Sequence, residues 1–260
     1  MSAVLVSRDA RGVATVTLNR PERRNAFDDA LIRELDRLFA NLARDTAVRV
    51  VVLTGAGSMF SAGADINWMR RVAGYSKREN HADAMGLARM LRRLDTLPKP
   101  SVARINGAAY AGAIGLICAC DVAVAATEAT FAISEVRLGL LPATIAPYVT
   151  ATIGARQARR FNLTGEAFSA DEALRIGLVQ KVAPLAQLDA ATDEIVAALL
   201  QGAPSAQAKA KRMIAAVAGK PITPSVTART ADAIAEARAS PEGREGLAAF
   251  LEKRKPRFRT

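Results

Sequence analysis

The chain has 260 residues, of which half are hydrophobic and only 5% are aromatic. This composition indicates a globular protein with an aliphatic core and excludes an intrinsically disordered chain. The formal net charge of +11 favours anionic partners, either phosphorylated small molecules or nucleic acid. No aromatic side chains are interspersed among the basic clusters as base stacking would require, so we do not expect a nucleic-acid partner.

The cysteine and histidine content argues against disulfides and metal sites. The two cysteines, Cys118 and Cys120, would point to different sides of a helix, and His81 is the only histidine. Both observations fit a reducing, cytoplasmic setting. The N-terminus does not have the pattern of a secretory signal. The longest apolar stretch, residues 108–126, is interrupted by Asp121, so we expect no membrane partner.

The predicted elements alternate between strands and helices along most of the chain. A polar turn at 9–12 followed by a strand at 13–18 predicts a β-hairpin, and Asp28 or Asp29 is expected to cap a helix that reaches Asp45. Further strands are predicted at 48–54, 101–105, 121–125 and 130–132, and helices at about 80–97 and 112–120. Residues 55–79 are predicted to be a loop with a broken helix, and residues 107–112 a loop. This alternation implies crossover connections and a mainly parallel sheet, the α/β class.

The pattern changes after about residue 184, where helical segments follow one another without clear strands. We therefore predict a β/α core over residues 1–200 and a helical C-terminal region over residues 201–260.

The sequence does not match two common enzyme motifs. Phe60 stands where a dinucleotide-binding fingerprint needs its third glycine, and no Gly-x-Ser-x-Gly elbow supplies a serine nucleophile.

Two glycine-containing stretches and one glutamate supply a candidate site for chemistry beside a carbonyl group. Small residues at 63–65 let a ligand approach the backbone, and residues 107–112 lead into a helix whose free N–H groups favour negative charge. Two such N–H groups can polarise a thioester or ketone, and Glu135 can move a proton at the adjacent carbons. Taken singly, either stretch is explained equally well by a tight turn.

The sequence resembles the crotonase, or enoyl-CoA hydratase/isomerase, superfamily, in segments that follow the family's order over nearly the whole chain. The matching segments are Leu18–Pro21 with Asn25–Phe27, Phe60–Asp65, Asn106–Gly112, Cys120–Asp121, Glu135–Pro142 and Phe250–Lys255. The resemblance implies a spiral of β/β/α turns with a helical C-terminal trimerisation region. It also implies trimers or hexamers made of two trimers.

The resemblance further implies a set of site residues. The backbone N–H groups of Ala64 and Gly112 would form the oxyanion hole for the thioester carbonyl, and Glu135 would be the catalytic acid/base. No cofactor is implied beyond the coenzyme A carried by the substrate. The residues expected to hold coenzyme A are Arg24, Ala26, Ala62, Ala64, Asp65, Ile66 and, from a neighbouring subunit, Lys253.

One departure from the family pattern leaves both hydration and isomerisation as candidate reactions. Hydratases of this family usually carry a second glutamate in the helix after Gly112, and Gly115 stands in its place. Hydration needs a water held by carboxylates, and one carboxylate can in principle serve both proton steps. Double-bond migration needs only one base. Taken by itself, the missing glutamate favours an isomerase over a hydratase, and it also permits a non-catalytic, RNA-binding homologue. The likeness described next outweighs it, so we expect a hydratase with the isomerase as the alternative.

The amino-acid sequences of two segments, Ala64–Met69 and Phe131–Tyr148, resemble more closely those of bacterial hydratases of branched glutaconyl-CoA substrates. In that comparison, glycine at position 115 is ordinary and would make room for a branched or carboxylated acyl group. Arg137 is then a candidate partner for a distal carboxylate, and a surface position explains it equally well. Trp68, Met69, Tyr75, Tyr110 and Tyr148 are candidates for the acyl pocket, although ordinary packing explains each of them as well.

Overall fold

The computed structural model describes residues 2–259. The strands are β1 (Val4–Arg8), β2 (Val13–Leu18), β3 (Val50–Gly55), β4 (Met59–Ser61), β5 (Ser101–Ile105), β6 (Ala108–Tyr110), β7 (Val122–Ala126), β8 (Thr130–Ala132), β9 (Ala167–Ser169) and β10 (Lys181–Ala183). The α-helices are α1 (Asp29–Arg44), α2 (Ile66–Val72), α3 (Lys77–Asp95), α4 (Gly112–Ala119), α5 (Ala146–Thr164), α6 (Ala170–Arg175), α7 (Leu188–Leu200), α8 (Pro204–Val217), α9 (Pro224–Ala239) and α10 (Pro241–Leu251). Short 3₁₀ helices lie at η1 (Pro21–Arg23), η2 (Glu135–Leu138) and η3 (Leu185–Gln187).

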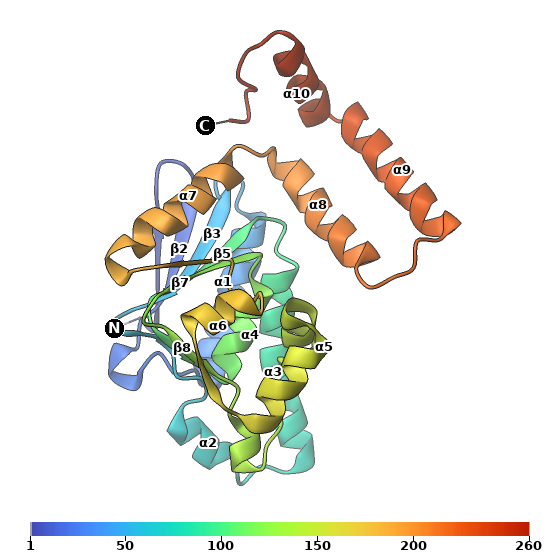
Figure 1. Ribbon diagram of the computed structural model, residues 1–260. Helices are drawn as coiled ribbons and strands as arrows, with labels where there is room; N and C mark the ends of the chain where they lie inside the picture. Colours follow the sequence, from blue (N-terminus) through green and yellow to red (C-terminus); the bar gives the residue numbers. More distant parts are fainter. Residues whose placement is uncertain (1, 260) are drawn as a thin grey trace.

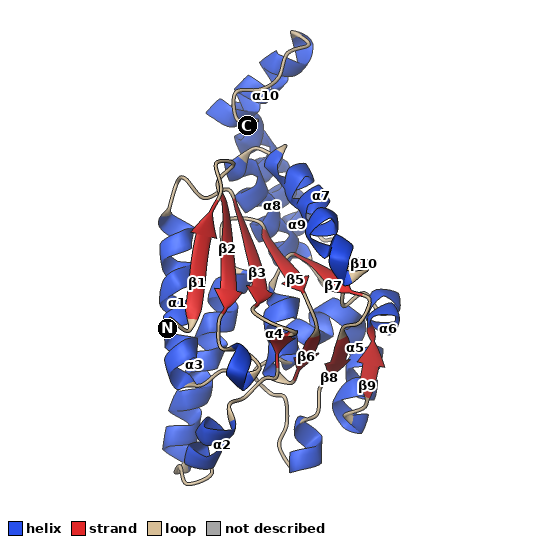
Figure 2. Ribbon diagram, turned by 90° about the vertical axis from the view of Figure 1, so that its left-hand side faces the viewer, coloured by secondary structure: helices blue, strands red, loops and turns tan. Residues whose placement is uncertain are grey.

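The strands form two sheets that the chain visits in turn (Figure 2). The larger sheet has the order β1-β2-β3-β5-β7-β10 and the smaller one β4-β6-β8-β9. Each turn gives one strand to each sheet and then a helix: β3 and β4 precede α2, β5 and β6 precede α4, and β7 and β8 precede α5. This is the expected spiral of β/β/α units. Apart from the β1–β2 hairpin, the larger sheet is parallel.

Alternate residues of the parallel strands enter two cores, as a sheet covered on both faces requires. In β3, Val50 and Val52 belong to the core beneath α7, whereas Val51 and Leu53 belong to the main core with α1, α3 and α4. Helix α1 joins that main core through one apolar stripe, and the side chain of Asp28 caps it by accepting from the N–H of Leu31 at 2.9 Å.

Two buried asparagines satisfy the backbone where the chain crosses from the larger to the smaller sheet. The amide nitrogen of Asn25 donates to the carbonyls of Ala56 and Met59, both at 2.8 Å. Asn106 donates to the carbonyl of Gly57 at 2.9 Å and accepts from the N–H of Gly55 at 3.2 Å. These side chains replace the ladder hydrogen bonds that the turn between β3 and β4 does not make.

Several sequence-based boundaries are wrong. The segment at 55–79, predicted as a loop with a broken helix, contains the short helix α2 but also the unpredicted strand β4, and the predicted loop at 107–112 contains β6. The helix expected from residue 80 begins at Lys77, because Ser76 and Glu79 form a capping box. Helix α5 and the short elements β9, α6 and β10 were not predicted at all.

The C-terminal helices α8, α9 and α10 extend away from the β/α body (Figure 1). Arg49, just before β3, links the β/α body to the start and the end of this extension. It donates hydrogen bonds to the carbonyls of Gly202 at 2.9 Å and Phe258 at 3.0 Å. The helical character expected after residue 184 is confirmed, while a two-domain division at residue 200 stays a prediction. Within residues 2–259, no helix combines the length and apolarity that crossing a lipid bilayer demands.

Candidate active site

The loop after β4 lies directly against the loop after β6. A Cβ on Gly63 would lie 2.7 Å from the carbonyl oxygen of Tyr110 and 3.1 Å from the Cβ of Ala111, and Gly63 has φ +84°. Only glycine fits this contact and this backbone conformation. The same loop pairs with Phe27, whose N–H donates to the carbonyl of Gly63 at 2.8 Å and whose carbonyl accepts from the N–H of Asp65 at 2.9 Å. These contacts fix the position of the Ala64 N–H between them.

The second predicted donor, the N–H of Gly112, begins helix α4. Ala111 before it has φ 52° and ψ −123°, a backbone conformation that is unfavourable for a non-glycine residue, and its N–H donates to the carbonyl of Ala132 at 2.8 Å. A Cβ on Gly112 would lie 2.9 Å from the ring of Phe27. Within residues 2–259, neither the Ala64 N–H nor the Gly112 N–H donates a hydrogen bond to a protein group. Both donors are therefore available to a ligand.

Glu135 begins the 3₁₀ helix η2 and brings a carboxylate to the same place. Its Oε2 atom is buried and makes no hydrogen bond to the described residues. Burial raises the pKa of Glu135, and the opposing effect of its own backbone N–H is smaller. A carboxyl with a raised pKa and a free oxygen can both accept and return a proton.

One cavity of about 520 Å³ joins these groups. Its lining includes Ala64, Gly112 and Glu135, together with Ala62. The remaining lining residues are mostly apolar, and most come from α2, α3 and the segment after η2. They are Phe27, Trp68, Met69, Val72, Asn80, Asp83, Ala84, Leu87, Ala111, Ser134, Leu138, Gly139, Leu140, Leu141, Pro142, Ala143, Thr144 and Ile145. An apolar cleft with two free N–H donors and one lone carboxylate suits an acyl chain with an activated carbonyl.

Some of the expected lining residues are in this cavity and others are not. Trp68 and Met69 line it, whereas Tyr75, Tyr110 and Tyr148 do not. The sequence-based analysis missed Phe27, Asp83 and Ile145. Asp83 left a readable signal, because it precedes Leu87 and Leu91 at intervals of four on the inward stripe of α3, where a carboxylate is out of place.

Asp65 is a structural residue beside the cavity. It caps α2 by accepting from the N–H groups of Asn67 at 2.8 Å and Trp68 at 3.3 Å, as expected for the turn after Ala64. Its other oxygen pairs with Arg20 at 3.3 Å and Arg23 at 3.4 Å. Burial on its own would raise the pKa of Asp65, but the two N–H groups and Arg20 outweigh it and hold the pKa below its ordinary value. Its side chain is thus occupied with holding Ala64 in place.

The remaining predicted coenzyme A residues lie outside the cavity. Arg24 and Ile66 are exposed, and Ala26 is buried with its carbonyl accepting from Arg20 at 3.0 Å. Lys253 follows α10, at the opposite end of the molecule from α2 (Figures 1 and 2). Within a single chain, Lys253 is therefore remote from the cavity.

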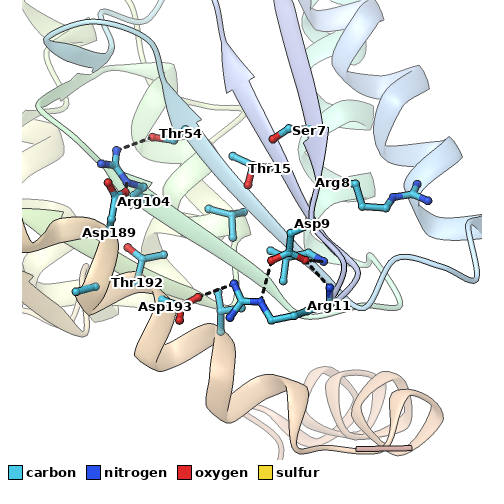
Figure 3. A pocket seen from close by; sticks show the side chains of 14 residues that line it. Ser7, Arg8, Asp9, Arg11, Thr15, Thr54, Arg104, Asp189, Thr192 and Asp193 are labelled. Carbon is cyan, nitrogen blue, oxygen red and sulfur yellow. Dashed lines mark hydrogen bonds and ion pairs between the residues drawn. The ribbon is translucent and has the colours of Figure 1, made fainter. Parts of the chain in front are cut away.

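A larger cavity, of about 640 Å³, lies between the β1–β2 hairpin and α7 (Figure 3). Most of its charged side chains pair with one another: Arg11 with Asp9 at 2.8 Å and with Asp193 at 2.7 Å, and Arg104 with Asp189 at 2.6 Å. Arg8, the remaining charged residue of the lining, pairs with Asp45 outside it. Because these groups neutralise each other, the groove offers no lone acid or base comparable to Glu135. In the part of the chain that the structure describes, no group of three or more His, Cys, Asp or Glu side chains could hold a metal ion.

Comparison with known proteins decides the family. The family model described as enoyl-CoA hydratase/isomerase matches residues 8–260. The chain belongs to the enoyl-CoA hydratase/isomerase family. It is 32% identical over 259 residues to a short-chain-enoyl-CoA hydratase from Clostridium acetobutylicum, covering 98% of this chain and 97% of that protein. It is also 37% identical over 196 residues to a hydroxycinnamoyl-CoA hydratase-lyase from Pseudomonas fluorescens, covering 74% and 71% of the two chains.

Solved structures of the family confirm the crotonase-like fold. The crystal structure of an enoyl-CoA hydratase from Shewanella pealeana has a TM-score of 0.96 and 40% identity to this chain, covering 98% of this chain and 96% of that one. An enoyl-CoA hydratase from Mycobacterium smegmatis has a TM-score of 0.94 with 34% identity, and the two chains cover each other completely. The α/β class and the spiral expected from the sequence are therefore established.

The space beside Gly115 is not available to a substrate, contrary to our sequence-based expectation. A Cβ on Gly115 would lie 2.4 Å from the Cγ2 and 3.0 Å from the Cβ of Ile145, and 3.4 Å from a methyl of Leu91. Ile145 thus occupies the direction in which other hydratases of the family are expected to project their second glutamate. Glycine at this position reflects close packing between α4 and the start of α5.

Arg137 does not serve the cavity either. It is exposed, and its side chain packs against Gly165, where a Cβ would lie 3.1 Å from the Arg137 Nε and 3.2 Å from its Cγ. Of the two interpretations of Arg137, the structure agrees with the surface residue and not with the partner of a distal carboxylate. The turn between η2 and α5 directs the chain so that Leu138 and Ile145 face the cavity instead.

We predict that Gly115→Ala destabilises the fold by about 1–3 kcal/mol, because the added methyl overpacks against Ile145. Ile145→Ala alone should also destabilise, but the double variant should cost less than the sum by about 0.5–3 kcal/mol. Denaturant unfolding measures the free energy of unfolding of the wild type, the two single variants and the double variant. Gly86→Ala in α3 is the control, because its Cβ would meet only Ile32 at 4.0 Å. Additive costs at positions 115 and 145 would contradict the packing account.

We also predict that Glu135→Gln stabilises the fold at high pH. Because burial raises the pKa of Glu135, the native state binds its proton more tightly than the unfolded chain does. Stability is therefore lost as pH rises from the unfolded pKa through the native one, and the amide removes that loss. The variant should melt a few degrees higher than wild type at pH 8, at about 2–4 °C per kcal/mol, and equally near pH 4.

Calorimetry or circular dichroism at both pH values measures this effect. Glu128→Gln, at an exposed glutamate between β7 and β8, is the matched control. An equal or lower melting temperature for Glu135→Gln at pH 8 would contradict the view that Glu135 is a buried carboxyl kept at the expense of stability.

Proposed function

We propose that this protein hydrates a 2-enoyl-CoA to a 3-hydroxyacyl-CoA. The observation that carries the proposal is a single cavity in which the buried, unpartnered Oε2 of Glu135 accompanies the free N–H groups of Ala64 and Gly112. Membership of the enoyl-CoA hydratase/isomerase family supports the same reaction class. The relatives' names differ in their acyl groups, so they do not select one for this chain.

In the proposed reaction, the thioester oxygen accepts hydrogen bonds from the N–H groups of Ala64 and Gly112. This polarises the conjugated double bond, so that the third carbon becomes electrophilic and the oxygen takes up negative charge. Glu135 removes a proton from water as the water oxygen bonds to the third carbon. The protonated Glu135 then gives that proton to the second carbon, the enolate collapses to the thioester, and the carboxylate is restored.

The coenzyme A contacts remain part of this proposal. The backbone around Ala26, Ala62 and Ile66 would hold the bent coenzyme A, and Arg24 would meet a phosphate. Support comes from the position of Ala62 in the cavity and from the exposure of Ile66 and Arg24. The carbonyl of Arg24 accepts a hydrogen bond from the N–H of Ala62 at 2.9 Å. We propose that no further cofactor takes part, since hydration transfers protons and no electrons. A cytoplasmic location also stays a prediction.

Isomerisation is the second candidate, favoured by one observation. Because Ile145 fills the space beside Gly115, no second carboxylate can project from α4, and one base is enough to carry a proton between two carbons. Hydration and isomerisation are distinguished by incubating the protein with crotonyl-CoA and with a 3-enoyl-CoA. Loss of the conjugated absorbance with the mass gain of one water supports hydration. A rise in absorbance at constant mass from the 3-enoyl ester supports isomerisation.

We predict that Glu135→Gln lowers turnover of the preferred ester by about 10²–10⁴-fold, because the amide can neither accept nor return the proton. The measurement is the initial rate of absorbance change under saturating ester. Glu128→Gln is again the control, since it removes an exposed carboxylate away from the cavity. Near-normal turnover by Glu135→Gln would remove Glu135 from the mechanism.

We further propose that the chains assemble as trimers, alone or paired into hexamers, through the C-terminal helices. Phe250 and Leu251 at the end of α10 are 80% and 78% exposed in the single chain, which is unfavourable unless another chain covers them. Such packing would also be the means by which Lys253 reaches a neighbour's coenzyme A.

We predict that sedimentation of wild type gives a trimer or hexamer, and that the double variant Phe250→Asp with Leu251→Asp dissociates, because buried carboxylates would lack partners. Leu185→Asp, at an exposed leucine of η3 on the β/α body, should leave the assembly intact. A monomeric wild type, or an unchanged assembly in the double variant, would contradict this use of α10.

A further inference from the structure

The wall of the active-site cavity that α2 and α3 form carries a second carboxylate, Asp83. Its Oδ1 accepts a hydrogen bond from the indole Nε1 of Trp68 at 3.2 Å, and Trp68 is itself almost fully buried. Among residues 2–259, no donor reaches the other oxygen, Oδ2. The indole therefore fixes the orientation of the carboxylate and leaves one acceptor oxygen free in a residue that lines the cavity.

This wall is where an acyl chain must continue. The thioester oxygen and the two reacting carbons are placed by Ala64, Gly112 and Glu135, so the rest of the chain extends along the side chains of α2 and α3. Most of these are apolar: Trp68, Met69, Val72, Ala84 and Leu87. Asp83 and Asn80 are the two polar side chains that these two helices contribute to the lining.

The charges around the cavity are unbalanced. Its lining contains the carboxylates of Asp83 and Glu135 and no lysine, arginine or histidine. The two cations whose charge lowers the pKa of Asp83, Arg71 and Arg33, are paired with Asp29, at 2.6 Å and 2.9 Å. A substrate tail that ended in a carboxylate would therefore meet like charge and no partner.

We propose that Asp83 selects acyl-CoA substrates whose chain ends in a hydrogen-bond donor, such as a hydroxyl group, and rejects those whose chain ends in a carboxylate. The inference rests on the proposed hydratase function and assigns its substrate class. This substrate class replaces the glutaconyl-CoA type expected from the sequence resemblance.

Hydrogen-bond chemistry explains both halves of this selectivity. A hydroxyl that donates to Oδ2 of Asp83 makes a charge-assisted bond, which is stronger than a bond between neutral groups. An alkyl tail of the same length would strip water from Oδ2 and return nothing, and a site built to bond a hydroxyl discriminates against such an analogue. A carboxylate tail adds repulsion to that loss.

The test compares kcat/KM for 2-enoyl-CoA esters of matched chain length that end in a hydroxyl, a methyl or a carboxylate group, over several lengths. At the best length, wild type should prefer the hydroxyl ester over the carboxylate ester by about tenfold or more. Asp83→Asn should lower that ratio by about tenfold, because the amide keeps an acceptor for Trp68 but loses the charge. The ratio is taken within each variant, so a general loss of activity cancels.

Asp95→Asn is the matched control, because it removes a carboxylate from the same helix outside the cavity and should leave the ratio unchanged. An ester ending in an ammonium group shows which donor the site prefers: a preference for either donor tail over the methyl and carboxylate tails supports the proposal, and a preference for the methyl tail over both donor tails overturns it. A wild type that prefers the carboxylate tail, or an unchanged ratio in Asp83→Asn, overturns the proposal.

Failure of the selectivity and failure of the hydratase function give different results. If crotonyl-CoA is hydrated but the tail ratio does not respond to Asp83→Asn, only the role of Asp83 is wrong. If no ester is hydrated, the hydratase function is wrong. Calorimetric binding of the corresponding saturated acyl-CoA esters then measures the same ratio without turnover, and equal affinities for the two tails would still overturn the role of Asp83.

Discussion

The close contact between two backbone loops around Phe27 is the constraint on which the site depends. Gly63 lies against the Tyr110–Ala111 backbone, Gly112 lies against the Phe27 ring, and neither position has room for a side chain. Because the loops meet this closely, the N–H groups of Ala64 and Gly112 are left without protein acceptors. Unpaired backbone donors are costly in a folded chain, and they persist where the surrounding packing over-determines them. Here the two sheets, α4 and the cap of α2 supply that packing.

Glu135 adds a second local destabilisation of the native state at the same place. A buried carboxylate oxygen without a partner destabilises the native state, and the burial that causes this also raises its pKa toward the range useful for proton transfer. The Asp65 network shows the contrasting arrangement. Its carboxylate is fully engaged by two N–H groups and two arginines, so it supports the site without taking part in chemistry. Environment alone assigns different roles to these two acids.

The sequence predicted the parts of this design that depend on local chemistry. The cap at Asp28, the turn after Asp65, the hairpin at 9–12 and the candidate Glu135 are all readable from residue type and spacing. Strands β4 and β6 could not be predicted, because three residues are too few to show a period. The capping box at Ser76 was present in the sequence, and using it would have placed the start of α3 correctly.

Other features follow only from tertiary contacts. Nothing near Gly115 in the chain reveals that Ile145, thirty positions away, fills the adjoining space, and this contact reverses the expectation of a roomier pocket. Likewise, only the folded chain shows that Arg137 packs on Gly165 and that Asp83 joins Trp68 in the cavity. The net positive charge is also partly neutralised locally. Arg160 pairs with Glu166 and Glu172, and Arg254 pairs with Glu245.

The most direct test of the account is a crystal structure of the protein with an unreactive acyl-CoA analogue. The account predicts that the thioester oxygen lies about 2.7–3.1 Å from the backbone nitrogens of both Ala64 and Gly112, with the Glu135 carboxylate facing the second and third acyl carbons. A thioester oxygen bound away from these two nitrogens, or an acyl chain in the groove between the β1–β2 hairpin and α7, would contradict it.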